Sequence, residues 1–155
     1  SNKRDENFYN NTNQSFNFAD GKVTASFGSA TAKLLEDRNE VDEAGEPLLD
    51  DKGNQVVTKG LKSQKKAIIK SQASGLLAPT DWYVIKATDV ESYSVPSAVT
   101  TFRANVRTKS NEMETAIDNA ADVDALATLY AYVNTGTEEN PVMERPLGEF
   151  PTLEI

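Results

Sequence analysis

The longest regular pattern in the chain is an apolar stripe that follows Pro96, and any fold must cover it. Five apolar residues recur there at spacings of three, four, seven and four, which is the period of one face of an α-helix. Proline is favoured in the first turn of a helix. We therefore predict a helix from about Ser97 to Ala120 that needs a covering layer. The stripe consists of Val99, Phe102, Val106, Met113 and Ile117.

A lysine-rich segment upstream is also expected to be helical. From Leu61 to Leu77 the apolar residues lie on one stripe and most lysines lie off it, and Pro79 ends the pattern. This composition suits a surface helix packed on its own core, or a helix that lies on a membrane.

The only tryptophan lies in the next segment. Thr80 or Asp81 can cap a short helix that runs to Val90, although Trp82 to Ala87 also fits a strand; we favour the helix. The side chain of Trp82 is either a core residue or an interface hot spot.

The C-terminal part is predicted to be one helix and an extended tail. Asp122 can cap a helix from Val123 to about Val133, and the short joint at 120–122 should make the last two helices an antiparallel helical hairpin. Prolines interrupt residues 136–155. This tail could wrap its own domain or lie in a partner's groove.

The N-terminal part is predicted to be β structure. An Asp20-Gly21 turn separates two alternating runs, which indicates a hairpin with a type I′ turn. The apolar positions of these runs are Phe16, Phe18, Val23, Ala25 and Phe27.

An eight-residue repeat follows the hairpin. Asp42–Leu49 (DEAGEPLL) aligns with Asp50–Val57 (DDKGNQVV), and each unit places a glycine before an apolar pair. We interpret the units as β-turns that lead into short strands.

The fold is therefore predicted to be α+β. Residues 1–14 form a flexible polar arm anchored only by Phe8 and Tyr9, 15–58 are rich in β-turns, 59–135 are helical and 136–155 form the tail.

Charge is distributed unevenly along this acidic chain, whose net charge is -8. Residues 36–51 contain eight acids and one arginine, whereas 59–70 contain five lysines and no acid. Both runs could be solvated, or they could dock on each other or steer a partner. The acidic balance disfavours nucleic-acid binding.

The chain contains neither cysteine nor histidine. Thiolate metal sites, disulfides and catalytic arrangements that depend on imidazole are therefore impossible. We expect no enzyme activity, cofactor or metal, no secretory signal and no membrane-spanning segment. A carboxylate-based enzyme that uses the acids between Glu36 and Asp51 is a remote alternative.

Five residues are candidates for partner binding. Arg103 and Arg107 lie one helical turn apart and could clamp acids of a neighbour, or simply be solvated. The remaining candidates are aromatic: Trp82, Tyr83 and Phe150.

The segment from Leu76 to Asp118 resembles tail or tail-fibre assembly proteins of tailed bacteriophages (tail assembly chaperones). The similarity rests on Leu-x-x-Thr-Asp-Trp, a linker that ends at a proline, and aromatic-Arg-x-x-x-Arg. The matching residues are Leu77, Thr80, Asp81, Trp82, Pro96, Phe102, Arg103 and Arg107. Phe102 stands where the family often has Trp or Tyr.

The resemblance implies a phage setting with tail, baseplate or tail-fibre proteins as partners. The first hypothesis is an assembly chaperone in the host cytoplasm that covers strand edges or apolar patches of a subunit until assembly. The second is a permanent minor component of the virion tail, baseplate or fibre, present in several copies of a symmetric assembly.

Overall fold

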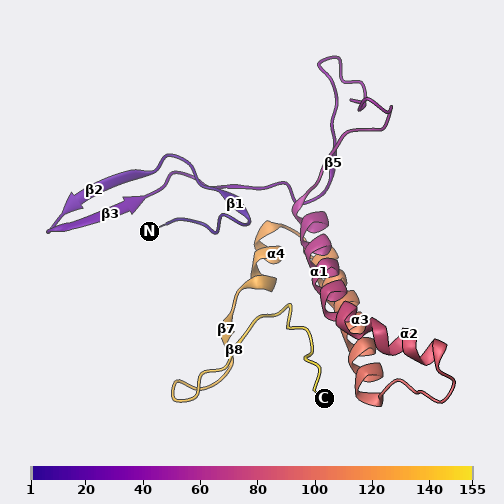
Figure 1. The fold of residues 1–155 in the computed structure, drawn as a ribbon. Coiled ribbons are helices and arrows are strands. Elements are labelled where there is room, and N and C mark those ends of the chain that lie inside the picture. The colour runs from indigo at the N-terminus through magenta and orange to yellow at the C-terminus, as the bar shows by residue number, and fades with distance from the viewer. Residues whose placement is uncertain (1, 155) are drawn as a thin grey trace. The chain divides into compact units, whose positions relative to one another are not determined.

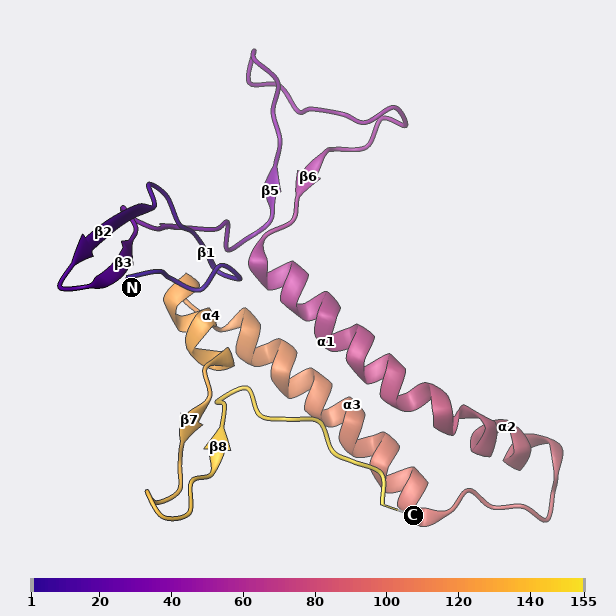
Figure 2. The same ribbon diagram turned by 60° about the vertical axis from the view of Figure 1, so that its left-hand side comes forward.

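The computed structural model describes residues 2–154, which adopt the predicted α+β fold with small antiparallel sheets before the helices (Figures 1 and 2). Two compact units can be distinguished, one formed by residues up to 64 with 122–127, the other by 65–121 with 128 onward. The helices are α1 (Leu61–Leu77), the short 3-10 helix η1 (Ala78–Thr80), α2 (Asp81–Asp89), α3 (Ser97–Asp118) and α4 (Val123–Tyr130).

Each sheet among the described residues has two antiparallel strands. The pairs are β1 (Tyr9–Asn10) with β4 (Thr31–Ala32), β2 (Ser15–Ala19) with β3 (Lys22–Ser26), β5 (Arg38–Asn39) with β6 (Val57–Thr58), and β7 (Val133–Asn134) with β8 (Met143–Glu144).

The predicted helices are present, and one of them ends early. The segment around Trp82 is helical rather than a strand, and Asp122 caps α4 by accepting a hydrogen bond from the N–H of Ala125 (2.7 Å). That helix ends at Tyr130 instead of Val133. Val133 pairs with Glu144 in a short hairpin, so strand pairing replaces the last predicted turn.

The core of the second unit lies between α1 and α3. Ala73 of α1 packs with Phe102 and Val106 of α3, and four partly buried residues complete this cluster: Leu76, Leu77, Phe150 and Leu153. Two ion pairs border it, Lys66 with Asp118 and Lys70 with Glu114. Because Lys70 lies four residues after Lys66 whereas its partner Glu114 lies four residues before Asp118, the two helices run antiparallel, as Figure 2 shows.

Residues 2–14 do not form the predicted free arm. Phe8 and Tyr9 are buried, and the N–H of Lys33 donates to the carbonyl of Phe8. The hydroxyl of Tyr9 donates to Asp124 (2.6 Å), which is also paired with Arg4. Burial raises the pKa of Tyr9. The arm is therefore anchored to its own chain through a residue that is distant in sequence.

The predicted Asp-Gly hairpin is present as the two-stranded ribbon β2–β3. Asp20 and Gly21 both have positive φ, 52° and 71°, as a type I′ turn requires. In the ribbon Phe16 faces Ala25 and Phe18 faces Val23. These four side chains share one face of the ribbon, because side chains alternate between the faces of a strand.

The eight-residue repeat forms two equivalent turns. Oδ1 of Asp42 accepts the N–H of residues 44 and 46, and Oδ1 of Asp50 accepts the N–H of residues 52 and 54. Gly45 and Gly53 have φ of 84° and 80°, which favours glycine. The predicted β-turns are present, and an isolated bridge flanks each of them. The predicted strand follows the second turn as β6, whereas within the described residues no strand directly follows the first.

The repeat also closes a three-way junction of hairpins. The N–H of Glu40 donates to the carbonyl of Val56, and the N–H of Val56 donates to the carbonyl of Leu48. The N–H of Leu48 in turn donates to the carbonyl of Glu40. Nε2 of Gln55 lies 2.7, 3.1 and 3.1 Å from the carbonyl oxygens of Glu40, Leu48 and Val56. Three backbone segments at an eight-residue spacing thus form a closed ring around one side-chain amide.

Removing residues 41–48 should leave one straight hairpin. The paired residues would then be Asn39 with Val57, Glu40 with Val56, and Leu49 with Gln55, which is a continuous antiparallel register. We expect this variant to fold with helix content unchanged, and cross-strand NOEs between Asn39 and Val57 to persist. Removing 41–47 is the control, because one extra residue shifts the register and turns the side chains to the wrong face. Loss of those NOEs in the eight-residue deletion would contradict the modular interpretation.

Asp37 caps the start of α1 by accepting hydrogen bonds. Its carboxylate accepts one hydrogen bond from Nζ of Lys59 (2.7 Å) and one from the N–H of Gly60 (2.9 Å). Hydrogen bonds from Lys59, Ser63 and Gly60 lower the pKa of Asp37 from 3.8 to about 2. A general acid needs a raised pKa, so this carboxylate is suited to accepting hydrogen bonds at the start of the helix rather than to donating protons.

The cap predicts a pH-dependent loss of stability. A carboxyl whose pKa is lower in the folded state stabilises above its unfolded pKa, and that stabilisation disappears as the pH falls from 3.8 toward 2. Asp37→Asn should therefore lower the melting temperature by a few degrees at pH 6, and the difference from wild type should vanish near pH 2. Asp51→Asn removes a charge from the same acidic run and serves as the control. A pH-independent difference would refute the cap.

Candidate protein-binding site

Helix α2 displays apolar side chains that its own domain leaves uncovered. None of its residues is buried, and Trp82 and Ile85 are 50% and 61% exposed. Val84 and Val90 are exposed as well. Trp82 and Ile85 lie one helical turn apart on the same side of the helix, and we call these two residues the α2 surface. The structure therefore contradicts the alternative in which Trp82 is a core residue.

Tyr83 lies on the inner side of this helix. It is half-buried, and its ring centroid is 3.9 Å from that of Trp82. Lys86 reaches over the Trp82 ring with Nζ 5.8 Å from the centroid. The indole is therefore supported from two sides and loses little conformational entropy when a partner covers it.

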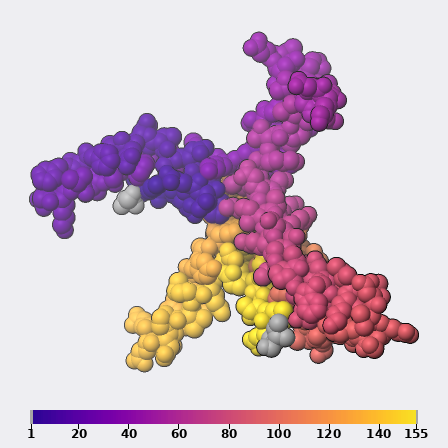
Figure 3. All heavy atoms as spheres, in the orientation of Figure 1, coloured from indigo at the N-terminus to yellow at the C-terminus, as the bar shows by residue number. Residues whose placement is uncertain are grey.

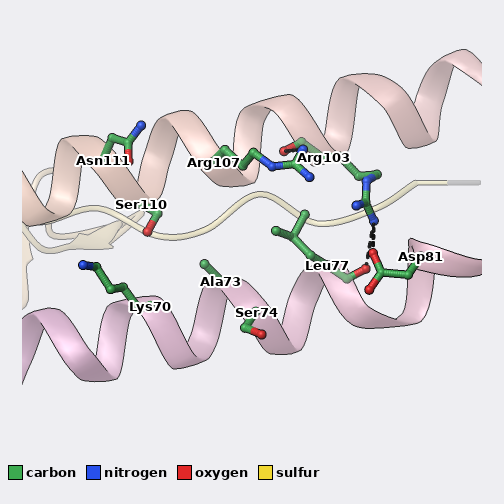
Figure 4. A pocket seen from close by; sticks show the side chains of 9 residues that line it. All are labelled: Lys70, Ala73, Ser74, Leu77, Asp81, Arg103, Arg107, Ser110 and Asn111. Carbon is green, nitrogen blue, oxygen red and sulfur yellow. Dashed lines mark hydrogen bonds and ion pairs between the residues drawn. The ribbon is translucent and has the colours of Figure 1, made fainter. Parts of the chain in front are cut away.

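Arg103 holds the junction between α1 and α2, which we call the corner. Its side chain is 13% exposed, and its Nη1 donates to the carbonyl of Leu77 (3.1 Å) and to Asp81 (2.7 Å) (Figure 4). The same nitrogen also donates to the hydroxyl of Thr80. Thr80 is buried, and its hydroxyl donates to the same Leu77 carbonyl (2.6 Å). Arg103 therefore positions the α2 surface, and its charge is already matched by Asp81.

Arg107 has a different environment one helical turn away. Its only recorded hydrogen bond in residues 2–154 goes to the carbonyl of Arg103 (3.2 Å), with no carboxylate partner. It lines a hollow of about 500 Å³ between α1 and α3, together with Lys70, Ser110 and Asn111. In Figure 4 Lys70 and Arg107 both reach into the space between the two helices. The hollow can accept an acidic side chain, because Arg107 has a free guanidinium face there.

The two arginines of the predicted double clamp therefore have different roles. The spacing of Arg103 and Arg107 was interpreted as two arginines aimed at one neighbour, but only Arg107 is available. Sequence reasoning missed Thr80 as a buried partner of Arg103. The polar pair Thr80-Asp81 just before Trp82 was the available signal in the sequence.

Phe150 packs inside its own unit. It packs with Leu153 against Phe102 and Val106, so this part of the tail wraps its own domain. Upstream in the tail, β8 pairs with β7 in a short antiparallel hairpin.

A second uncovered apolar surface lies on the β2–β3 ribbon. Phe16, Phe18 and Val23 are 69%, 72% and 67% exposed. The space-filling view shows the ribbon as a thin projection (Figure 3). The sequence alternation indicates one apolar face, but within residues 2–154 no layer buries it. We call this face, with Ala25, the ribbon face.

The two charged runs are partly paired. In the first unit Lys59 and Lys62 form ion pairs with Asp37 and Glu36 (2.7 and 2.6 Å). The two runs therefore dock on each other through ion pairs between the first residues of each run.

In residues 2–154 no group of acidic side chains is arranged to hold a metal ion. No helix in that range is both long and apolar enough to span a membrane. No protein-family description, curated protein or solved structure matches the chain significantly.

Proposed function

We propose that this chain is a non-enzymatic protein-binding protein of phage tail or tail-fibre assembly. The observation that carries the proposal is the display of two apolar surfaces, the α2 surface and the ribbon face, whose large side chains are at least 40% exposed. Monomeric proteins rarely leave such surfaces uncovered unless a partner binds them.

The total exposed surface supports the same conclusion. The chain exposes 10690 Å², whereas a compact monomer of 16.9 kDa exposes about 7,700 Å². Even two separate compact units of half that mass would expose only about 9,300 Å² in total. The excess does not depend on how the units are arranged, and it is comparable to the surface buried in a standard protein interface.

The chaperone role follows from what these surfaces can cover. An unassembled tail or fibre subunit exposes strand edges and apolar patches that would otherwise aggregate. The ribbon can pair with an edge, Trp82 can fill an apolar pocket, and Arg107 can bind an acid beside it. Tyr83 supports the indole from behind.

A permanent place in the virion is the second candidate. It is favoured by the many short hairpins that carry little core of their own, because such elements gain stability from neighbours in an assembly. Mass spectrometry of purified particles separates the candidates: stoichiometric presence supports the virion role, and absence supports the chaperone role.

Trp82→Ser tests the proposal directly. We expect the free energy of unfolding to change by less than about 1 kcal/mol, because Trp82 is half exposed. Binding to a coexpressed tail, baseplate or tail-fibre subunit of the same phage should weaken by about thirtyfold or more, as for an aromatic hot spot. Tyr132→Ser, at an exposed aromatic outside α2, is the control. Unchanged binding in Trp82→Ser would remove the α2 surface from the site.

A further inference from the structure

The ribbon β2–β3 has one edge that is closed and one that is open. Ala19 and Lys22 flank the two-residue turn and form its closing hydrogen-bonded pair. Hydrogen-bonded and non-hydrogen-bonded pairs alternate along an antiparallel ladder. The backbone groups of Phe16 and Phe18 therefore point outward from β2, and those of Val23 and Ala25 point outward from β3.

The β3 edge is closed at its end by the N-terminal segment. The side-chain amide of Asn2 donates to the carbonyl of Phe27 (2.7 Å) and accepts its N–H (2.7 Å). These are the two bonds that a residue of an added strand would make. Lys3 places Nζ 5.9 Å from the centroid of the Phe27 ring. A strand added along β3 would have to displace these residues.

The β2 edge has none of the usual protection. Natural sheets guard free edges with lysine, proline, bulges or covering segments. The strand Ser-Phe-Asn-Phe-Ala contains neither charge nor proline, and its register with β3 is free of bulges. Within residues 2–154, the backbone groups of Phe16 and Phe18 make no recorded hydrogen bond outside the ribbon.

A second copy of the chain does not fit this surface well. The ribbon face offers about 400 Å², counting about 200 Å² for a fully exposed phenylalanine. A stable dimer needs about 800 Å² on each partner. Pairing two β2 edges would satisfy the backbone, but it would double the uncovered apolar face.

We infer that the β2 edge adds as a strand to an open sheet edge of a partner β-protein, while the ribbon face covers apolar residues next to that edge. Such a partner supplies both missing components, a strand for Phe16 and Phe18 and an apolar layer for their rings. The inference rests on the proposed function, and it specifies the partner as an unassembled β-rich subunit.

Two substitutions at one position separate backbone pairing from ring burial. Phe16→Thr removes the ring and keeps the outward N–H, whereas Phe16→Pro removes both. The probes are the tail, baseplate and tail-fibre subunits of the same phage, each coexpressed with the full chain. We expect Phe16→Pro to bind at least about fivefold more weakly than Phe16→Thr, the effect of one lost hydrogen bond. Ala25→Pro, on the β3 edge, should bind like wild type.

Amide exchange of the complex provides the second measurement. The N–H groups of Phe16 and Phe18 should exchange rapidly in the free chain and become protected in the complex. Protection of Asn17 in the free Phe16→Pro variant shows that the ribbon is still folded. If a complex forms but Phe16→Pro binds like Phe16→Thr and both amides stay unprotected, the inference alone is overturned. If no subunit binds, the proposed function fails and the inference fails with it.

Discussion

Replacing Phe102 with alanine should destabilise the second unit by about 3–5 kcal/mol, which is the cost of removing a buried aromatic ring. The ring is 6% exposed and belongs to the buried cluster with Ala73 and Val106, against which the tail residues Phe150 and Leu153 pack. A small domain has little stability to spare. We therefore expect substantial unfolding at 37 °C, measured by circular dichroism at 222 nm during urea titration.

The tail provides an independent measure of the same loss. Cleavage by a glutamate-specific protease between Glu149 and Phe150 should become much faster in Phe102→Ala, because the buried cluster against which Phe150 packs loses its aromatic ring. Phe102→Leu keeps most of the volume and should cost less than about 1.5 kcal/mol. Equal protection of that bond in Phe102→Ala and wild type would show that the tail is held elsewhere.

Features set by local sequence could be predicted. The period of the apolar residues indicated α3, and the Asp-Gly pair indicated the β2–β3 turn, because both depend on neighbours in the chain. The eight-residue repeat indicated two similar turns, since Gly45 and Gly53 occupy equivalent positions.

Features set by distant partners could not be predicted. The hydroxyl of the buried Tyr9 is bound by Asp124, which lies 115 residues later in the chain. Val133 leaves the expected helix because it pairs with Glu144. The three-way junction needs three backbone segments to close a ring, and no single segment carries that signal.

The candidate site follows the same rule. Exposure of Trp82 depends on whether another element covers α2, which the periodicity of α2 itself cannot reveal. The spacing of Arg103 and Arg107 places both side chains on one side of α3, but only the structure shows that Asp81 and Thr80 bind the first of them.

Arg103→Met should release the corner between α1 and α2. The substitution leaves the buried hydroxyl of Thr80 without the group that donates to it, and it removes the ion-pair partner of Asp81. The carbonyl of Leu77 then keeps only the hydrogen bond from Thr80. Because Asp81 is about half exposed, part of its charge is solvated, and we expect a loss of about 2–3 kcal/mol. Helix α2 has no buried residue of its own, so it should become mobile before the rest of the unit unfolds. The fluorescence anisotropy of Trp82, the only tryptophan, measures this directly.

Arg107→Met is the matched control for the corner. It removes the same type of side chain one helical turn away, where the recorded bond goes only to the carbonyl of Arg103. Its stability should stay within about 0.5 kcal/mol of wild type, and its anisotropy should not change. Arg103→Lys keeps the charge but cannot hold three acceptors with one planar group, so it should resemble Arg103→Met more than wild type. If the Arg103 and Arg107 variants behaved alike, Arg103 would be a solvated charge, and the rigid display of Trp82 would need another cause.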